Sequence, residues 1–522
     1  MTQDVRATAS AIGRLEPKMG MDEQVNAAQG LKPRLSLFDA TTIVAGSMIG
    51  SGIFIVSADI ARQTGSPAGL LAVWLVSGLM TVAGALSYGE LAAMMPQAGG
   101  QYIFLRESYG GTLAFCFGWT LLLVIQTGTI AAVAVAFGRF AGVIFPAITP
   151  QLFSGIGTVG ISTERITAIA VIALLTAVNL RGVNLGRIVQ NIFTSAKILS
   201  LLFIVIVACV IAPNAAAIRT NFGTLSSFSG PHEFSGGLVV AFGAAMVGAL
   251  FSADAWGTVT FTAAEVRNPA RNLPHALALG TGVVIALYLL TNAAYMFELP
   301  TAMNSAGPDT RPAATVFAQG IAGAGSDRVA TAAMRMVWGS AGAFITAIIV
   351  MVSTFGCANG LILTGARVIY AMARDGLFFA SAGLLNQASV PALALIIQGG
   401  WASLLTLSGT YSQLLDYVIF AQLIFYVLTV GAVFILRVKR AEAPRPYRAW
   451  GYPLVPAAYI LAGVGLMADL LLVKPKYTWP GLLIALSGIP LYWLTQLRSS
   501  DRRMRVRVPE TDVPRSMPDP DG

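Results

Sequence analysis

Residues 37–65 read LFDATTIVAGSMIGSGIFIVSADIARQTG, and the fold can be worked out from this stretch. It exceeds the roughly 20 apolar residues that a helix needs to cross a bilayer. Its centre, however, holds three glycines and two serines between Gly46 and Gly52. Glycine inside a helix costs about 1 kcal/mol relative to alanine, so the cluster favours unwinding at mid-membrane. The alternative is close helix packing through small residues.

A second stretch, residues 236–265, reads GGLVVAFGAAMVGALFSADAWGTVTFTAAE. It has the same pattern, a long apolar run with small residues near its middle. Small residues precede Asp254, an acid near the expected bilayer centre. A charge there costs about 2.5–3.5 kcal/mol or more unless a partner or a water-filled cavity is present. Asp254 either binds a ligand or caps a second half-helix, and in both cases a helix begins at mid-membrane. Paired broken spans in corresponding halves predict a binding site at the midplane.

Broken helix ends suit a zwitterionic ligand. Helix N-termini present free N–H groups and a positive dipole end, which fit a carboxylate. Carbonyl groups at helix C-termini fit an ammonium group. One site that offers both matches the backbone end of an α-amino acid. Because Asp254 is the one charged side chain near the breaks, neutral amino acids are favoured, with a cationic amino acid or a polyamine as the alternative.

The composition excludes most other classes of protein. Of 522 residues 56% are apolar and 11% charged, whereas soluble domains carry about 25% charged residues. A cytosolic enzyme, a disordered scaffold and a nucleic-acid binder are excluded, despite the net charge of +9. The chain shows no catalytic or nucleotide-binding pattern, so we expect no enzyme and no cofactor. Cys116, Cys209 and Cys357 fit neither a metal site nor a disulfide framework.

Twelve apolar runs are long enough for membrane-spanning helices. With the N-terminus in the cytoplasm, 23 of the 33 lysines and arginines lie inside and 9 outside, as the positive-inside rule requires. Both termini are therefore expected in the cytoplasm, with tails at 1–36 and 498–522 and no signal peptide. The expected spans are 37–62, 68–94, 112–145, 165–181, 188–212, 236–264, 274–298, 335–366, 391–408, 412–436, 453–473 and 478–497.

Lys197 is the one lysine or arginine inside an expected span. Its long side chain could reach the cytoplasmic interface by snorkelling. Alternatively, it is a buried cation at a position where other transporters hold a sodium ion. A buried lysine could also exchange a proton during transport. The sequence leaves these alternatives open.

Several motifs together carry a resemblance to a known family. The chain resembles the amino acid–polyamine–organocation superfamily over residues 35–497, and within it the L-type amino-acid transporters and their bacterial relatives. The motifs are IVAGSMIGSGIF (43–54), SYGELAAMMPQAGGQYIFLRESYG (87–110), FSADAW (251–256), EVRNPARNLPHA (265–276), FGCANGLILTGARVIYAMARDG (355–376) and PRPYRAWGYPLVP (444–456).

The resemblance implies an all-α polytopic membrane protein with a five-plus-five inverted repeat. The first repeat would be 37–212 (helices 1–5), the second 236–436 (helices 6–10), and 453–497 would add helices 11 and 12. Helices 1 and 6 would be discontinuous. The implied function is secondary active transport of amino acids across the inner (plasma) membrane by alternating access, independent of sodium, by exchange (an antiporter) or proton coupling.

The resemblance also implies which residues bind substrate. Backbone N–H groups of the first break would bind the carboxylate, and carbonyl groups of both breaks would bind the amino group. The implied substrate-binding residues are Met48, Ser51, Gly52, Ile53, Phe251, Ser252, Ala253 and Asp254. Lys197 would replace a sodium ion, near Ser353 and Thr354. Weaker pocket candidates are Gln126, Asn359 and Gln422, and no metal site is implied.

The chain departs from the family at two places. Ala253-Asp254-Ala255-Trp256 stands where the family often has Tyr-Asp-Gly-Trp, so the pocket's size is not carried over. The loop at 146–164 lacks the cysteine that animal members use to bond an accessory subunit. We therefore expect no disulfide-linked partner. An amino-acid sensor embedded in the membrane is the competing class of protein, and the short tails disfavour it.

Charged residues flank two of the inner loops, and two interpretations remain open. They would form an inner gate, or they are ordinary interfacial ion pairs worth about 0–1 kcal/mol. These residues are Glu90, Arg106, Glu107, Glu265, Arg267 and Arg271.

Overall fold

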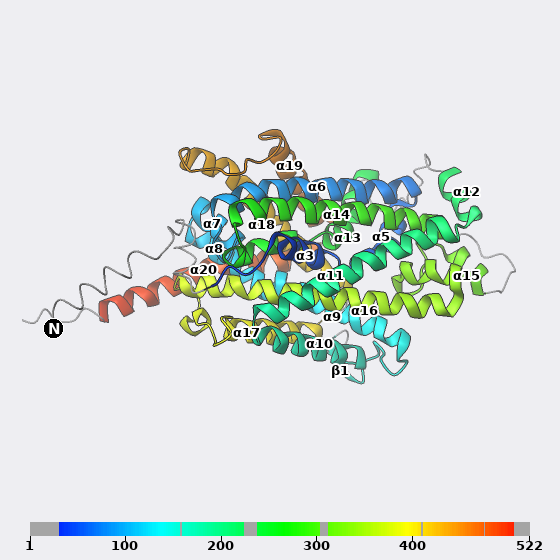
Figure 1. Cartoon of the computed structure of the whole chain (residues 1–522), viewed down its shortest axis with the longest axis horizontal. Coiled ribbons are helices and arrows are strands. Elements are labelled where there is room, and N and C mark those ends of the chain that lie inside the picture. The colour runs from blue at the N-terminus through cyan, green and yellow to red at the C-terminus, as the bar shows by residue number, and fades with distance from the viewer. Residues whose placement is uncertain are drawn as a thin grey trace, which may run out of the picture.

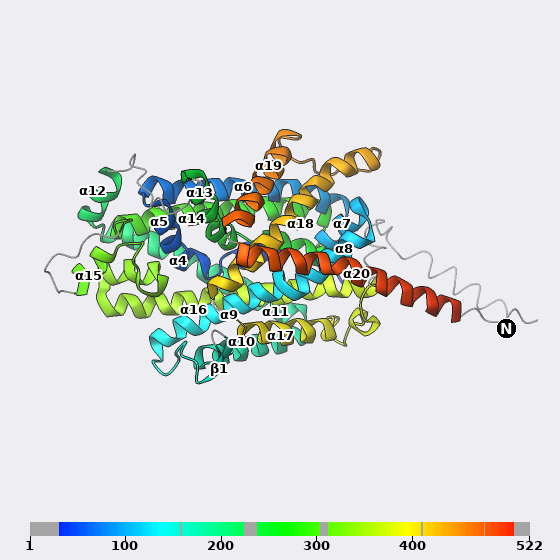
Figure 2. The same ribbon diagram turned by 180° about the vertical axis from the view of Figure 1, so that it is seen from behind.

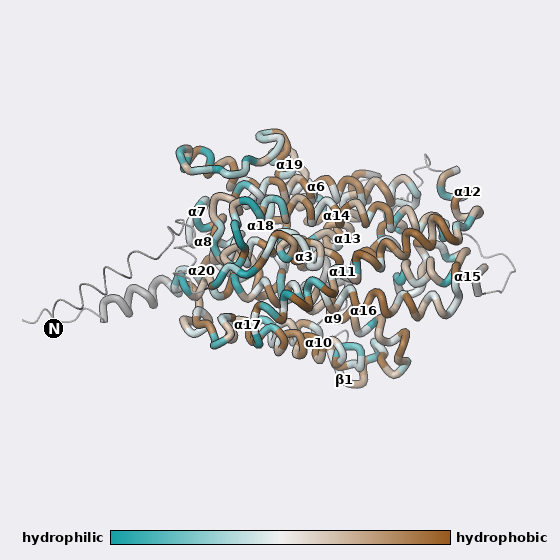
Figure 3. Tube along the Cα trace, in the orientation of Figure 1, coloured by the Kyte–Doolittle hydropathy of each residue, from teal (hydrophilic) through white to brown (hydrophobic). Residues whose placement is uncertain are grey.

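The computed structural model describes residues 31–156, 159–223, 237–302, 312–408, 411–473 and 475–505. Most of both expected tails therefore lies outside the described residues. The described chain is an elongated bundle whose long helices run mostly along its long axis (Figure 1). Apolar residues dominate these helices, and hydrophilic segments gather toward the end of the bundle where α7 and α8 lie (Figure 3).

The first part of the chain is helical apart from one short β-hairpin. Its elements are α3 (Leu37–Met48), α4 (Gly52–Ile55), α5 (Ser57–Thr64), α6 (Pro67–Met94), α7 (Gln101–Tyr109), α8 (Gly111–Thr120), the π-helix η1 (Leu121–Ile125), α9 (Gln126–Ile144), β1 (Ser154–Ile156), β2 (Val159–Ile161), α10 (Thr163–Leu180), α11 (Val183–Ile206), the π-helix η2 (Val207–Ile211) and α12 (Ala215–Gly223). The two strands pair antiparallel.

The second part continues the bundle with helices alone. Its elements are α13 (Gly237–Ser252), the 3₁₀-helix η3 (Trp256–Glu265), α14 (Pro269–Glu298), α15 (Pro312–Gln319), η4 (Gly325–Asp327), α16 (Val329–Arg374), η5 (Ala380–Gly383), α17 (Ala392–Thr406), α18 (Tyr411–Lys439), α19 (Leu454–Val473) and α20 (Pro475–Arg505). Seen from behind, α20 runs across the bundle beside α18 (Figure 2), and it packs on α8 and α18.

Ten helical stretches of the described chain are long and apolar enough to cross a membrane. The expectation of a polytopic all-α membrane protein is thus confirmed. Two of the twelve expected spans are not among the ten. The run 391–408 falls on α17, an apolar helix of 15 residues, and 478–497 falls on α20, which contains Pro480 and Pro490. The inverted-repeat layout stays a prediction.

Local signals in the sequence explain where several helices begin. The Ser36 hydroxyl oxygen accepts a hydrogen bond from the Asp39 backbone N–H, and the Asp39 carboxylate accepts one from the Ser36 backbone N–H, a capping box that starts α3. Ser66 caps α6, which has proline at its first position. Ser162 caps α10 in the same manner, through the backbone N–H of Arg165.

Helix α16 is longer than its expected span of 335–366. It covers 46 residues, and its backbone leaves helical geometry at Trp338 and Gly339, where Gly339 has φ +57°. The longer part of α16 therefore runs on from this kink to Arg374. It carries Ser353 and Cys357, which face the break in the first span.

The N-terminal segment closes one end of the bundle. The backbone N–H groups of Arg34 and Leu35 both donate to the Glu265 carbonyl, and Leu35 accepts from Arg267. Leu31 is buried in a small apolar cluster with Ala98, Ala264 and Tyr370. The segment before α3 thus lies against the C-terminal end of η3.

Candidate functional site

The first span is broken where the glycine cluster predicts. α3 ends at Met48, residues 49–51 are not helical, and α4 begins at Gly52. A helix end leaves its last carbonyl groups without intrahelical partners. Side chains from other helices satisfy them here: Cys357 Sγ lies 3.0 Å from the Ser47 carbonyl oxygen, and Ser353 Oγ donates to Ile49 at 3.1 Å and to Gly50 at 2.9 Å.

Lys197 is directed to the same helix end. Its Nζ donates to the Gly46 carbonyl at 2.7 Å and to the Ile49 carbonyl at 2.8 Å, and the side chain is fully buried. Gly356 of α16 makes room for it, because a Cβ there would lie 3.2 Å from Lys197 Cε. The ammonium group therefore contacts the break and does not reach toward the membrane surface.

The sixth expected span is broken as well. α13 ends at Ser252, and the 3₁₀-helix η3 begins at Trp256. Between them Ala255 has φ +66°, in the left-handed region. This conformation favours glycine over residues with a Cβ. Because alanine has a Cβ, the Ala255 backbone is strained here. In the resemblance described above, glycine often stands at this position.

The two breaks touch each other. A Cβ on Gly52 would overlap Ser252, whose Cα would be 2.9 Å away, so the start of α4 and the end of α13 are in direct contact. Tyr288 of α14 links them, because its hydroxyl lies 3.0 Å from the Met48 carbonyl oxygen and 2.9 Å from that of Ser252. One hydroxyl proton is thus shared by the ends of both half-helices.

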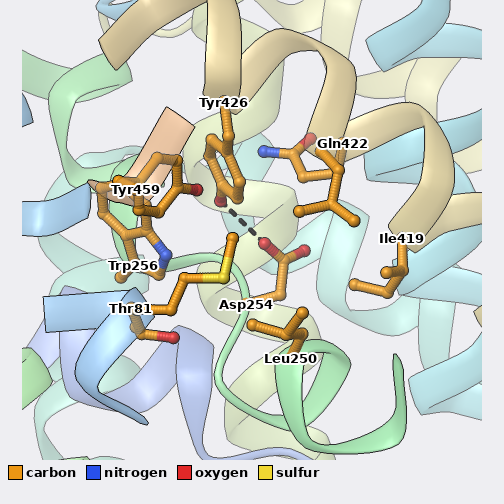
Figure 4. Close-up of a pocket in the computed structure, with 10 residues that line it drawn as sticks. Thr81, Leu250, Asp254, Trp256, Ile419, Gln422, Tyr426 and Tyr459 are labelled. Atoms are coloured by element: carbon orange, nitrogen blue, oxygen red, sulfur yellow. Dashed lines mark hydrogen bonds between the residues drawn. The ribbon is translucent and has the colours of Figure 1, made fainter. Parts of the chain in front are cut away.

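Three small cavities meet at Asp254. Asp254 lines all three. Its side chain is 6% exposed and accepts a hydrogen bond from the Tyr426 hydroxyl at 2.7 Å. Figure 4 shows the first cavity, with Gln422 beside this pair and Tyr459 and Trp256 opposite. We call this first cavity the tyrosine cavity, after Tyr426 and Tyr459. The second is the glutamine cavity, after Gln101, Gln126 and Gln422. The third is the break cavity, which Ser51 and Gly52 of the first break line.

Most of the expected substrate-binding residues lie together in the break cavity. Asp254 lines it together with five others: Met48, Ser51, Gly52, Phe251 and Ser252. Ile53 and Ala253 are buried but line none of the three cavities. The Met48 carbonyl already accepts from Tyr288.

The remaining expected residues divide into two groups. Gln126 and Gln422 line the glutamine cavity, and Ser353 touches the break. Asn359 does not face a cavity, because its amide bonds Gly186, Gln190 and Asn179 on α10 and α11. Thr354 is buried, and its hydroxyl donates to the carbonyls of its own helix.

Three residues at the site were not predicted from the sequence. Tyr288 bridges the breaks, Tyr426 bonds Asp254, and Cys357 lines the break cavity. The two tyrosines are hydroxyl-bearing residues on apolar spans, which is a usable signal, since a buried hydroxyl needs a partner. No cluster of His, Cys, Asp or Glu side chains able to hold a metal occurs in the part of the chain that the structure describes.

Ion pairs hold the end of the bundle near the N-terminal segment. Arg367 and Glu265 form a fully buried pair, with Nε 2.8 Å from Oε1. Glu90 accepts from Arg437 Nη2 at 2.7 Å. Burial alone would lower the pKa of Arg106, but its bonds to Asp375 and Glu107 raise that pKa above its ordinary value. Four of the charged residues expected near these loops, Glu90, Arg106, Glu107 and Glu265, therefore form ion pairs with residues that are far away in the sequence.

The chain belongs to the amino acid permease family, whose model matches residues 35–491. It is 31% identical over 486 residues to the b(0,+)-type amino acid transporter 1 of Homo sapiens, covering 92% of this chain and 91% of the relative. It is 30% identical over 470 residues to the serine/threonine exchanger SteT of Bacillus subtilis, covering 89% and 97%. It is also 30% identical over 469 residues to the large neutral amino acids transporter small subunit 2 of Homo sapiens, covering 89% and 80%.

The family and these relatives are named as transporters, permeases or exchangers, and the described part of the chain carries ten helical stretches long and apolar enough to cross a membrane. It is therefore a multi-pass membrane protein that transports amino acids.

Proposed function

We propose that this protein is a secondary active transporter that moves neutral L-amino acids by alternating access. The substrate's carboxylate would bind the backbone N–H groups at the start of α4, and its amino group would bind carbonyl oxygens at the ends of α3 and α13. Binding through backbone groups needs no charged side chain. It would therefore hold the zwitterionic end that all α-amino acids share.

The observation that supports this proposal is the meeting of the two breaks. α3 and α13 both end inside apolar spans, and Met48, Gly52 and Ser252 line one cavity. Irregular backbone within a membrane is tolerated where it is buried in protein or lines a cavity. In transporters with interrupted helices, such half-helix ends bind the substrate at the midplane.

Independence from sodium is supported by Lys197. Its ammonium group occupies the space beside the Gly46 and Ile49 carbonyls, where a bound cation would otherwise be coordinated. A positive charge fixed there would repel a sodium ion. Lys197 would then either stay charged while the protein exchanges one amino acid for another, or carry a proton in symport. The name of the Bacillus subtilis exchanger favours exchange.

A cationic amino-acid or polyamine carrier is the second candidate function. Its support is Asp254, whose carboxylate lines all three cavities and could face a distal ammonium group.

We further propose that the protein lies in the plasma membrane with both termini in the cytoplasm, where most of its lysines and arginines would then lie. No disulfide-linked accessory subunit is proposed, because the loop at 146–164 contains no cysteine.

Transport by the purified protein in liposomes tests the proposal. Each of the twenty amino acids is offered in labelled form, with and without an unlabelled amino acid inside and with or without sodium. We expect labelled neutral amino acids to accumulate without sodium, and faster when an internal counter-substrate is present. Uptake of arginine or agmatine alone would replace the proposal by the second candidate. No uptake of any amino acid would contradict both.

A further inference from the structure

The glutamine cavity adjoins the break cavity, where the zwitterion is proposed to bind. The two cavities share Thr129, Asp254 and Ala255 as lining residues. The glutamine cavity in turn shares Gln422 and Tyr426 with the tyrosine cavity. A substrate whose backbone end lies at the breaks would therefore direct its side chain past Asp254 toward Gln422. The following inference rests on this proposed binding mode.

Gln422 has an amide oxygen that lacks a hydrogen-bond partner. The side chain is 5% exposed and lines both cavities, and its Oε1 is buried without a partner among the described residues. Gln422 and Tyr426 lie one turn apart on the same face of α18, with Asp254 opposite them (Figure 4). Leaving a buried acceptor unsatisfied costs about 1–3 kcal/mol. Because Gln422 lines both cavities, a ligand that enters them comes within reach of its amide.

The neighbouring polar groups already have partners. Gln126 Nε2 donates to the Leu361 carbonyl at 2.7 Å, and Gln101 Nε2 donates to Thr429 Oγ1 at 3.1 Å. The Thr258 and Tyr426 hydroxyls donate to the Ala255 carbonyl and to Asp254. None of the residues that line the glutamine cavity is a lysine or an arginine. The cavity therefore offers acceptors, at Gln422 and Asp254, to whatever enters it.

We propose that Gln422 is a specificity-determining residue that selects amino acids whose neutral side chain carries a hydroxyl or amide hydrogen-bond donor. Serine, threonine, asparagine and glutamine have such a donor, whereas alanine, valine, leucine and methionine do not. A site that leaves a polar group unpaired discriminates against the ligand that lacks the matching group more strongly than an apolar pocket discriminates by size. Threonine and valine are the sharpest pair, because they have nearly the same shape.

The test compares exchange of threonine with that of valine, and of glutamine with that of methionine, in liposomes. In the wild type we expect kcat/KM for threonine to exceed that for valine by about tenfold, the size of one good hydrogen bond. Gln422→Met keeps the length of the side chain and removes its polar atoms. It should bring both ratios close to one.

Gln398→Met is the matched control. Gln398 is also a buried glutamine whose Oε1 lacks a partner among the described residues, yet it lines none of the three cavities. Its replacement should leave both substrate ratios unchanged.

Three results would overturn the inference while leaving amino-acid transport intact. The first is a wild type that moves valine as well as threonine, a measurement that needs no variant to fold. The second is a Gln422→Met protein that keeps the wild-type ratios. The third is a preference for lysine or ornithine over threonine. It would show that Asp254, and not Gln422, recognises the substrate's side chain in this cavity. Absence of all amino-acid exchange would instead contradict the proposed function.

Discussion

Lys197 shows how one side chain can hold an irregular backbone in place. Its ammonium group donates to two carbonyl groups, of Gly46 and Ile49, that belong to the last turn of α3 and the residue after it. Hydrogen bonds from a charged donor contribute about 1.5–3 kcal/mol each. The bonds also connect α11 to α3, so a movement of the half-helix must either carry the lysine along or break them.

Replacement of Lys197 by methionine tests this role. Lys197→Met keeps most of the side-chain volume but leaves the Gly46 and Ile49 carbonyls without these donors. We expect the initial rate of exchange in liposomes to fall by more than about tenfold, because the broken helix end loses its anchor. An unchanged rate would show that Lys197 is dispensable.

Glycine and small-residue clusters predicted where the breaks lie, and the family resemblance named Met48, Gly52 and Ser252 at them; all three line the break cavity. Side-chain direction was harder to predict. Asn359 was placed near the pocket, but its amide turns to α10 and α11. The direction of a side chain on a helix buried on all sides depends on its neighbours, which one sequence does not reveal.

Helix interruptions are the elements that composition predicted best. The breaks at 49–51 and 253–255 lie where small residues interrupt apolar runs. The 3₁₀ geometry of η3 and the π-helical turns at η1 and η2 had no signal in the sequence. Such turns often occur at hinges and functional sites. The short hairpin of β1 and β2 was not predicted either.

Replacement of Gly52 by valine tests the contact between the breaks. A side chain at Gly52 would overlap Ser252 and push the start of α4 away from α13. It would also crowd the N–H groups proposed to bind the carboxylate. We expect Gly52→Val to abolish binding of labelled substrate to purified protein, with an affinity loss of at least about a hundredfold if binding persists, since overpacking costs roughly 1–3 kcal/mol and one binding contact is lost as well.

Gly282→Val is the control for this experiment. Gly282 lies on α14, and a Cβ added there would have no other atom within 4 Å, so its replacement should leave binding intact. Wild-type affinity in Gly52→Val would place the substrate elsewhere.

In the molecule as a whole, the candidate site is closed to solvent. Met48 is 2% exposed, Phe251 6% and Asp254 6%. At the end expected to face the cytoplasm, the N-terminal segment and the buried Glu265–Arg367 pair hold η3 against α16. A transporter that alternates access must release this closure. Ten of the twelve expected spans were predictable from hydropathy, and the breaks from their small residues, whereas a closure made by partners far apart in sequence was not.

Replacement of Glu265 by glutamine should loosen this closure. Removing one partner of a buried ion pair costs about 3–5 kcal/mol, so the end near Arg367 should open more often. Cys357 reports the opening because it lines the break cavity and is 2% exposed. In a background with serine at positions 116 and 209, we expect Glu265→Gln to raise the labelling rate of Cys357 by an impermeant thiol reagent on the cytoplasmic side by more than about tenfold.

Glu107→Gln is the matched control. Glu107 also pairs with two arginines, but its side chain is 23% exposed, and exposed pairs contribute little. It should leave the labelling rate near that of the background protein. Equal labelling in Glu265→Gln and in Glu107→Gln would rule out the Glu265–Arg367 pair as the closure.

The length of α16 has a consequence for studying this protein in its membrane. From the kink at Gly339 to Arg374, at 1.5 Å per residue, the helix extends about 50 Å, whereas the hydrocarbon layer is about 30 Å thick. Unless α16 is steeply inclined, about two to four turns stand clear of the lipid. A fluorophore attached at the exposed end of α16, near Arg374, would be accessible from water, and it would be joined by a continuous rod to the residues that flank Lys197.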